Sequence, residues 1–309
     1  MSQQRIVPNI WCQGTAEEAG AFYAAAFENS SFEVESRYPE TGLLDFQQPL
    51  AGKALTVGLL ISGYRFTLIN AGNEFSPNPS ISFMLNFDPL LFDNDAEQAK
   101  TSLNRLWEKL LDGGRALMPL GEYPFSAHYG WVEDRFGVSW QLILTDPAGD
   151  PRPFIMPSLM CDGIAQNRAA EAADRYVELF APMFAETGGT AVGNRFPYGQ
   201  PSGKASAEAL AFGEFRLGEQ WFVCNDNGSG VDHGFSCGVS LEVQCNGQPE
   251  IDHLWEGLSA VPEAEQCGWL ADEFGVSWQI VPENMGELME HPGAFERMLQ
   301  MKKLVIADL

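Results

Sequence analysis

The spacing of apolar residues predicts a chain of short strands interrupted by a few helices. Residues 5–12 form an apolar run typical of a buried strand, and residues 16–27 place alanine and aromatic residues at helical spacing. A second helix is predicted over residues 95–111. Further strands are predicted at residues 32–38, 54–61, 64–70, 81–87, 115–121, 128–133 and 138–144. The first half of the chain therefore reads as two consecutive β-α-β-β-β units.

The second half of the chain repeats the first. Residues 134–143 (DRFGVSWQLI) return as residues 272–281 (DEFGVSWQIV), with seven of ten positions identical. A period near 150 residues is too long for a solenoid and indicates duplicated domains, as the length of 309 residues also suggests. We predict two domains, 1–147 and 152–309, with a shorter second unit in the second domain.

The repeated motif predicts the last hairpin of each domain. Asp134 and Gly137 occupy the first and last positions of a four-residue turn, as type I turns prefer. Strand alternation then places Trp140 on an apolar face and Gln141 on the opposite face. Gln141 and its counterpart Gln279 either hold a polar ligand inside the curved sheet or bond to neighbouring strands.

Composition narrows the classes of function. The formal net charge is −24, which disfavours binding to nucleic acid or to an anionic membrane. The start of the chain lacks an apolar signal segment, and the six cysteines form no disulfide-like spacing, so a cytoplasmic location is expected. Cys12 and Cys161, at equivalent strand ends, are either thiol nucleophiles or small apolar fillers.

Taken together, these features resemble the vicinal oxygen chelate superfamily. The resemblance rests on the paired units, the proline in the first strand, Phe22-Tyr23 in the helix and the closing Trp-x-x-Asp-x-Phe-Gly-Val-Ser-Trp-Gln. Residues 267–272 and 298–304 resemble the PhnB-like branch, often labelled 3-demethylubiquinone 3-methyltransferase-like. The resemblance implies an α+β fold of tandem glyoxalase-like domains, each of paired units forming a cup-shaped half-barrel. It also implies an intramolecular pseudo-dimer, with further homodimerisation left open.

Many enzymes of this superfamily hold a divalent metal inside the cup, and the resemblance locates the corresponding positions here. They are Pro8 and Pro157 on the first strands, Phe66 and Trp221 near a mid-sheet carboxylate position, and Gln141 and Gln279 in place of a closing glutamate. Proline and aromatic side chains cannot ligate an ion, whereas an amide oxygen can. We therefore expect no metal and no other cofactor, with a divalent metal as the alternative.

Several other residues are candidates for a site. His128, with Glu122 nearby, is the best candidate for a general acid or base at the mouth of the first cup. The alternative is an ordinary loop histidine without a catalytic role. Glu242 is predicted by alternation to share a strand face with polar residues, where it either acts as an acid or base or is simply exposed. Trp131 and Trp269 either line the ligand or anchor the core and rim.

Methyl transfer from S-adenosylmethionine receives no support from the sequence. Such enzymes use a glycine-rich loop between a strand and a helix, whereas the run Asn227–Gly230 is predicted between two strands. We expect a protein that binds a small metabolite in a cup without a metal, with enzymatic activity unassigned. The alternatives are a metal-dependent enzyme of glyoxalase or dioxygenase type and a sequestering protein of resistance type.

Overall fold

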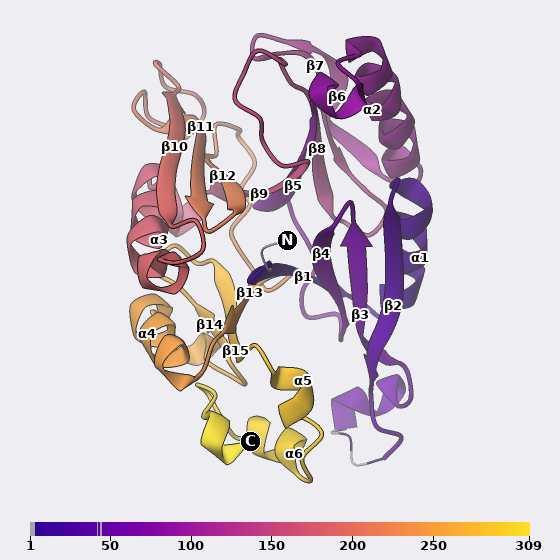
Figure 1. The fold of residues 1–309 in the computed structure, drawn as a ribbon, viewed down its shortest axis with the longest axis vertical. Coiled ribbons are helices and arrows are strands. Elements are labelled where there is room, and N and C mark those ends of the chain that lie inside the picture. Colours follow the sequence, from indigo (N-terminus) through magenta and orange to yellow (C-terminus); the bar gives the residue numbers. More distant parts are fainter. Residues whose placement is uncertain (1–3, 42, 44) are drawn as a thin grey trace.

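The structure, a computed structural model, describes residues 4–41, 43 and 45–309. It contains two open β-sheets with helices on the outer sides (Figure 1). In sheet order, the strands of sheet A are β14 (Trp269–Ala271), β15 (Ser277–Pro282), β13 (Val239–Cys245), β1 (Ile6–Cys12), β4 (Tyr64–Asn70), β3 (Ala54–Ile61) and β2 (Ser30–Arg37). Those of sheet B are β10 (Thr190–Pro197), β11 (Leu210–Leu217), β12 (Gln220–Asp226), β9 (Ile155–Cys161), β5 (Ile81–Phe87), β8 (Ser139–Leu144), β7 (Ser126–Glu133) and β6 (Arg115–Tyr123).

Four long helices cover the sheets. They are α1 (Ala16–Ala26), α2 (Ala96–Leu111), α3 (Ala169–Phe184) and α4 (Gln248–Leu258), followed by the short helices α5 (Met285–Leu288) and α6 (Ala294–Met298). Helices α1 and α4 pack on sheet A, whereas α2 and α3 pack on sheet B. Figure 1 shows α1 and α2 along one side of the molecule and α3 and α4 along the other, with the strands between them. Within the described ranges, no helix combines the length and apolarity needed to cross a membrane.

The predicted elements are confirmed. Every strand and helix expected in the first half is present, with bounds that shift by at most two residues. The shorter second unit of the second repeat is also present, because only β14 and β15 follow α4. The α+β fold of tandem glyoxalase-like units is therefore the observed fold.

The two repeats exchange units when they form the sheets. Sheet A joins the first unit of the first repeat to the second unit of the second repeat, through antiparallel pairing of β1 with β13. Sheet B joins the other two units, through antiparallel pairing of β5 with β9. The expectation that each repeat builds its own cup is therefore wrong. Within each unit, the first strand pairs in parallel with the last strand. The other edge of the first strand is therefore free, and it pairs antiparallel with the first strand of a unit from the other repeat.

Strand alternation gives each sheet two distinct faces. On β1, Ile6, Ile10 and Cys12 join the large apolar core together with Tyr23 of α1, so this outer face packs on the helices. We call the opposite face, turned away from the helices, the inner face. On β8, Trp140 lies in the core and Gln141 on the inner face, as the alternation predicted.

Candidate functional site on the inner faces

The aspartate of the repeated motif ties the last hairpin to a helix. In the second repeat, Asp272 Oδ1 accepts hydrogen bonds from the backbone N–H groups of Phe274 and Val276 at 2.9 and 3.0 Å. Its Oδ2 accepts from Tyr176 Oη at 2.6 Å and from Trp278 Nε1 at 2.8 Å. Burial raises the pKa of the Asp272 carboxyl, and the tyrosine and tryptophan donors oppose that shift.

The first repeat builds the same network. Asp134 accepts hydrogen bonds from the backbone of Phe136 and Val138 and from the side chains of Tyr23 and Trp140. The turn closes with glycine at a positive φ, 81° at Gly137 and 90° at Gly275, which glycine adopts without a side-chain clash. Since the aspartate carboxylates are fully engaged, the motif is structural apart from its glutamine.

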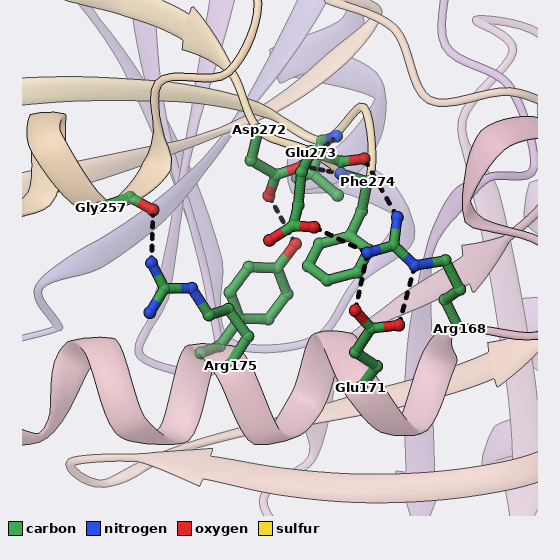
Figure 2. A network of polar contacts seen from close by, with 9 residues as sticks. Arg168, Glu171, Arg175, Gly257, Asp272, Glu273 and Phe274 are labelled. Atoms are coloured by element: carbon green, nitrogen blue, oxygen red, sulfur yellow. Dashed lines mark hydrogen bonds and ion pairs between the residues drawn. The ribbon is translucent and has the colours of Figure 1, made fainter.

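An ion-pair cluster adds a second link on the outside of this hairpin. Figure 2 shows Arg168 between Glu171 of α3 and Glu273 of the turn, and the guanidinium lies 2.7 Å from each carboxylate. The same guanidinium lies 4.5 Å from the ring centroid of Phe274. These exposed contacts join α3 to the hairpin and leave the inner face untouched.

On sheet B, Gln141 is engaged at both ends of its amide. Tyr129 Oη donates to Gln141 Oε1 at 2.7 Å, and Gln141 Nε2 donates to Ser82 Oγ at 2.8 Å. A longer contact of 3.5 Å reaches Ser158 Oγ. The geometry therefore favours the structural interpretation of Gln141 over its predicted ligand-binding role.

The rest of this inner face combines an apolar cluster with an ion pair from the linker, and the Nε1 of Trp131 is buried on it without an acceptor among the described residues. Met84, Met156 and Val223 form a small second core on which Trp221 packs. The linker residue Arg152 lies 4.1 Å from the ring centroid of Trp221, and it pairs with both carboxylate oxygens of Glu214 at 3.0 Å. Trp131 stands opposite Gln141 in the strand register.

Sheet A places a polar group at the equivalent position. Glu242 lies between Val7 and Gln279 in the register, and its carboxylate accepts from Gln244 Nε2 at 3.1 Å and from Asn9 Nδ2 at 3.4 Å. Gln279 Nε2 donates to Ser240 Oγ at 2.8 Å. Asn9 is 1% exposed, and its Oδ1 is buried without a hydrogen-bond donor among the described residues. Likewise, no donor in the described part of the chain reaches Gln279 Oε1.

Burial raises the pKa of the Glu242 carboxyl. The hydrogen bonds from Gln244 and Asn9 and the positive charge of Arg65 oppose that shift, whereas Glu35 adds to it. Arg65 is itself paired with Glu35 at 2.5 Å. The inner face of sheet A therefore holds a partly buried carboxyl whose proton is retained more readily than that of an exposed glutamate.

Two tryptophans border this polar group. Trp11 and Trp269 meet edge to face with ring centroids 6.4 Å apart, and Trp269 pairs with Gln279 in the register. Trp11 Nε1 donates to the carbonyl of Gly72 at 2.8 Å, which fixes the ring. Trp269 therefore lies beside Gln279 on the inner face of sheet A.

The donor set does not fit a divalent metal of the glyoxalase kind. Among the described residues, Glu242 lies beside three neutral amides, Asn9, Gln244 and Gln279, and sheet B offers Met84 in place of that carboxylate. Across the described ranges, no cluster of three or more histidine, cysteine, aspartate or glutamate side chains is arranged to hold a metal. Such sites ordinarily use imidazole and carboxylate ligands together.

Strand pairing does not support treating Phe66 and Trp221 as equivalent positions. Phe66 lies in the outer core, against Phe83 and Trp140, and matches Phe222 of the second repeat rather than Trp221. The shift arises because the glycines of the two turns, Gly63 and Gly218, occupy different turn positions. Trp221 instead matches Arg65, and both lie on inner faces.

Pro8 and Pro157 also miss the inner face. Strand alternation puts Pro8 on the same side as Ile6 and Ile10, which pack in the helix-facing core. The neighbouring Val7 and Asn9 project inward instead. A polar residue inside an apolar strand run was the signal that could have identified Asn9.

His128 does not lie at a cup mouth. Its Nε2 is 2.6 Å from Asn104 Oδ1 of α2, on the outer face of sheet B. Burial, with help from the charge of Lys100, lowers the pKa of His128. Glu122 is exposed on β6, and no hydrogen bond between described residues joins it to His128. The structure therefore does not assemble the predicted acid–base pair.

The cysteines and the glycine-rich run have structural placements. Cys12 and Cys161 lie buried in the core cluster, and burial raises the pKa of the Cys12 thiol to about 12, which suits an apolar filler. Residues 227–230 lie in the loop between β12 and β13 and open no helix. This run therefore lacks the strand-to-helix setting that binding of S-adenosylmethionine would use.

Comparison with known structures gives related proteins of three kinds. A PhnB protein from Bacillus cereus is 31% identical, over 46% of this chain and 100% of its own, with a TM-score of 0.39. Protein PA1353 from Pseudomonas aeruginosa is 23% identical over 46% of this chain and 98% of its own, with a TM-score of 0.36. Glyoxalase I from Zea mays is 9% identical over 96% of this chain and 97% of its own, with a TM-score of 0.49. Among curated proteins, none matches the chain.

A family model supplies the assignment. The model described as 3-demethylubiquinone-9 3-methyltransferase matches residues 4–143 and again residues 154–281. Each match spans one repeat and contains its copy of the closing motif, which confirms the predicted PhnB-like branch and its duplication. The chain therefore belongs to the 3-demethylubiquinone-9 3-methyltransferase family, as two tandem copies of the family domain.

Proposed function

We propose that the inner face of sheet A binds a small polar molecule that presents hydrogen-bond donors. The observation that carries this proposal is the buried, unpartnered Oδ1 of Asn9. Buried polar atoms in folded proteins are almost always hydrogen-bonded, so an orphaned acceptor on an inner face supports the binding of a donor there. Gln279 Oε1 offers a second acceptor, and Glu242 lies between the two.

The surroundings indicate the class of ligand. The edge-to-face pair of Trp11 and Trp269 provides an apolar wall beside the polar groups. A small ring compound bearing hydroxyl or amino groups satisfies the wall and the acceptors at once. Both halves of the face come from this chain, so the site is complete without a second copy.

Proton transfer at Glu242 is the second candidate function. A carboxyl whose pKa is raised by burial gives and accepts protons closer to neutral pH than an exposed one. A bound molecule with an acidic proton within reach of Glu242 would then be a substrate rather than only a ligand. Methyl transfer, which the family name mentions, is not proposed, because the glycine-rich run opens no helix.

Thermal unfolding in a panel of polar metabolites tests the binding site. A ligand at about 100 times its Kd stabilises the folded state by about 2.7 kcal/mol. Asn9→Ser and Gln279→Ala should abolish that stabilisation, and Gln141→Ala on sheet B is the matched control that should keep it. Equal loss in Gln141→Ala, or an undiminished response in both sheet A variants, would contradict the proposal.

Two further measurements separate the alternatives. Metal analysis of protein purified without a chelator should give far less than one divalent ion per chain; a stoichiometric ion would favour the metalloenzyme instead. For any stabilising metabolite that is turned over, Glu242→Gln should remove turnover while retaining the thermal stabilisation. Retained turnover would exclude Glu242 as the proton carrier.

A further inference from the structure

A cavity of about 430 Å³ lies between helices α1 and α2 and the linker, away from the polar group on the inner face of sheet A. This volume falls within the range of small-molecule sites. Its apolar lining consists of Phe27, Phe87, Leu91, Phe92, Leu106 and Phe154. Three cations, Arg105, Lys109 and Arg152, also line it, together with the single carboxylate of Glu28.

Aromatic rings form one wall of the cavity. Phe92 stacks on Phe87 with centroids 6.3 Å apart, and Phe154 meets Phe87 edge to face at 5.4 Å. Leu91 at the rim is 60% exposed, although it is a large apolar side chain. An apolar ligand body would cover this leucine and bury it against the rings.

The charges of the lining are unusual for this chain. The protein has 42 acidic and 18 basic residues, yet three cations line the cavity. Arg152 is paired with Glu214 and Arg105 with Glu28, so Lys109 supplies the positive charge that no carboxylate among the described residues pairs with. Arg105 and Glu28 form an exposed pair at 3.2 Å, which an incoming anion can open at little cost. Lys109 donates to the carbonyls of Ala25 and Ala26 at the end of α1 and keeps its charge close to the cavity.

The equivalent place in the second repeat is filled. There the position of Phe154 is taken by Arg5, whose guanidinium donates to Gln244 O at 2.8 Å and pairs with Glu250 at 2.5 Å. Helix α4 has 11 residues, whereas α2 has 16 and is preceded by the 3-10 turn Pro89–Phe92. The cavity is therefore a feature of the first repeat and not a general gap between duplicated units.

We propose that this cavity binds an amphipathic monoanion, with its apolar body on the phenylalanine wall and its carboxylate beside Arg105 and Lys109. The apolar lining selects for a hydrocarbon or aromatic body, and the cation excess selects for a negative head group. The site is independent of the one proposed on sheet A, because the cavity lining shares no residue with the group formed by Asn9, Glu242 and Gln279.

Isothermal titration of the full chain with decanoate, decanol and hexanoate tests the ligand class. Decanoate should bind at least tenfold more tightly than either decanol or hexanoate, since one lacks the charge and the other lacks the apolar length. Equal binding of decanol and decanoate would overturn the anionic assignment, and an absence of decanoate binding would overturn the site.

Variants at one ion pair then locate the binding. Arg105→Gln should weaken decanoate binding about fivefold to tenfold, whereas Glu28→Gln should strengthen it about twofold by freeing Arg105. Disruption of the local structure would instead weaken binding in both variants. Ser102→Trp, which fills the cavity, should abolish binding, and Arg115→Gln, at an exposed pair on β6, is the matched control that should leave it unchanged.

If Ser102→Trp and Arg105→Gln both bind decanoate as the unaltered chain does, the cavity is not the site. Asn9→Ser should bind decanoate normally, so that failure here and failure of the sheet A proposal can be told apart.

Discussion

The inner faces of the two sheets are built from equivalent positions of one duplicated unit, and several of these positions carry different chemistry. The equivalent pairs, with sheet A first, are Glu242 and Met84, Arg65 and Trp221, Thr67 and Val223, and Asn9 and Ser158. Next to its closing glutamine, sheet A has the Glu242 carboxyl and the unpartnered Oδ1 of Asn9. At the corresponding place, sheet B has a methionine cluster, a glutamine engaged at both ends of its amide, and the indole N–H of Trp131, which is buried without an acceptor among the described residues. The difference places a carboxyl beside the closing glutamine on sheet A, where sheet B has a thioether.

The largest loss of stability should come from removing the aspartate of the closing motif, which both repeats share. Asp134→Ala and Asp272→Ala each leave a buried tyrosine hydroxyl, an indole N–H and two backbone N–H groups without an acceptor. Each variant should lose about 3 kcal/mol of unfolding free energy, measured by urea denaturation. A loss in one repeat only would show that the shared motif is structural in just one of them.

The ion pairs on the two inner faces should differ in how much they contribute to the free energy of unfolding. Glu214→Ala leaves the guanidinium of Arg152, whose side chain is 15% exposed, without its partner, and should cost about 2 to 3 kcal/mol. Glu35→Ala removes the partner of Arg65, whose side chain is 42% exposed and can be solvated, and should cost less than about 1 kcal/mol. Equal costs in denaturant titrations would contradict the view that the linker pair is built into the core of sheet B.

Glu242→Gln should stabilise the protein at neutral pH by roughly 1 kcal/mol, because it removes a charge that the fold partly buries. The pKa of Glu242 is raised above 4.5 in the folded state, so the folded chain holds this proton at pH values where the unfolded chain has lost it. The contribution of Glu242 is therefore complete below pH 4.5 and declines as the pH rises.

The variant should accordingly gain stability over the unaltered chain as the pH increases from about 4 to 8. Urea denaturation at several pH values measures that difference. The reverse exchange on sheet B, Met84→Glu, should destabilise the fold at pH 7. An unchanged free energy of unfolding in this variant would contradict the proposed difference between the two inner faces.

The smallest contrast concerns the two glutamines. Gln141→Ala removes two good hydrogen bonds and leaves Tyr129 Oη without its acceptor, so it should cost about 1 to 2 kcal/mol. Gln279→Ala removes one bond and should cost about 0.5 to 1 kcal/mol. Denaturation without added ligand measures both costs. A larger loss of unfolding free energy in Gln279→Ala than in Gln141→Ala would show that the glutamine of sheet A has the structural role.

The sequence predicted the elements because local patterns determine them. The periodicity of β8 separated Trp140 from Gln141 correctly, and the duplicated motif located both closing hairpins. The site was harder to predict, since it depends on which strands meet. Asn9 lies in the first repeat and Glu242 in the second, and only the exchange of units brings them within 3.4 Å. No pattern within one repeat contains that information.

The misplaced residues show the same limit. An alignment of the turn glycines Gly63 and Gly218 equates Phe66 with Trp221, but strand pairing sets the register and shifts the match by one residue. His128 was assigned to a cup mouth from its position near a loop, whereas alternation along β7 turns it toward α2. A shift of one residue along a strand moves a side chain to the opposite face of the sheet. The prediction of site residues is therefore more sensitive to small alignment errors than the prediction of strands and helices.

The exchange of units also changes what the linker does. Because each sheet needs strands from both repeats, neither half of the chain completes a sheet alone. Cutting the linker near residue 150 would turn a unimolecular folding reaction into the association of two fragments, with assembly then dependent on fragment concentration. The intact connection supplies an effective concentration in the millimolar range typical of short tethers. Duplication in one chain therefore frees the protein from the dilution that would dissociate a dimer of separate copies.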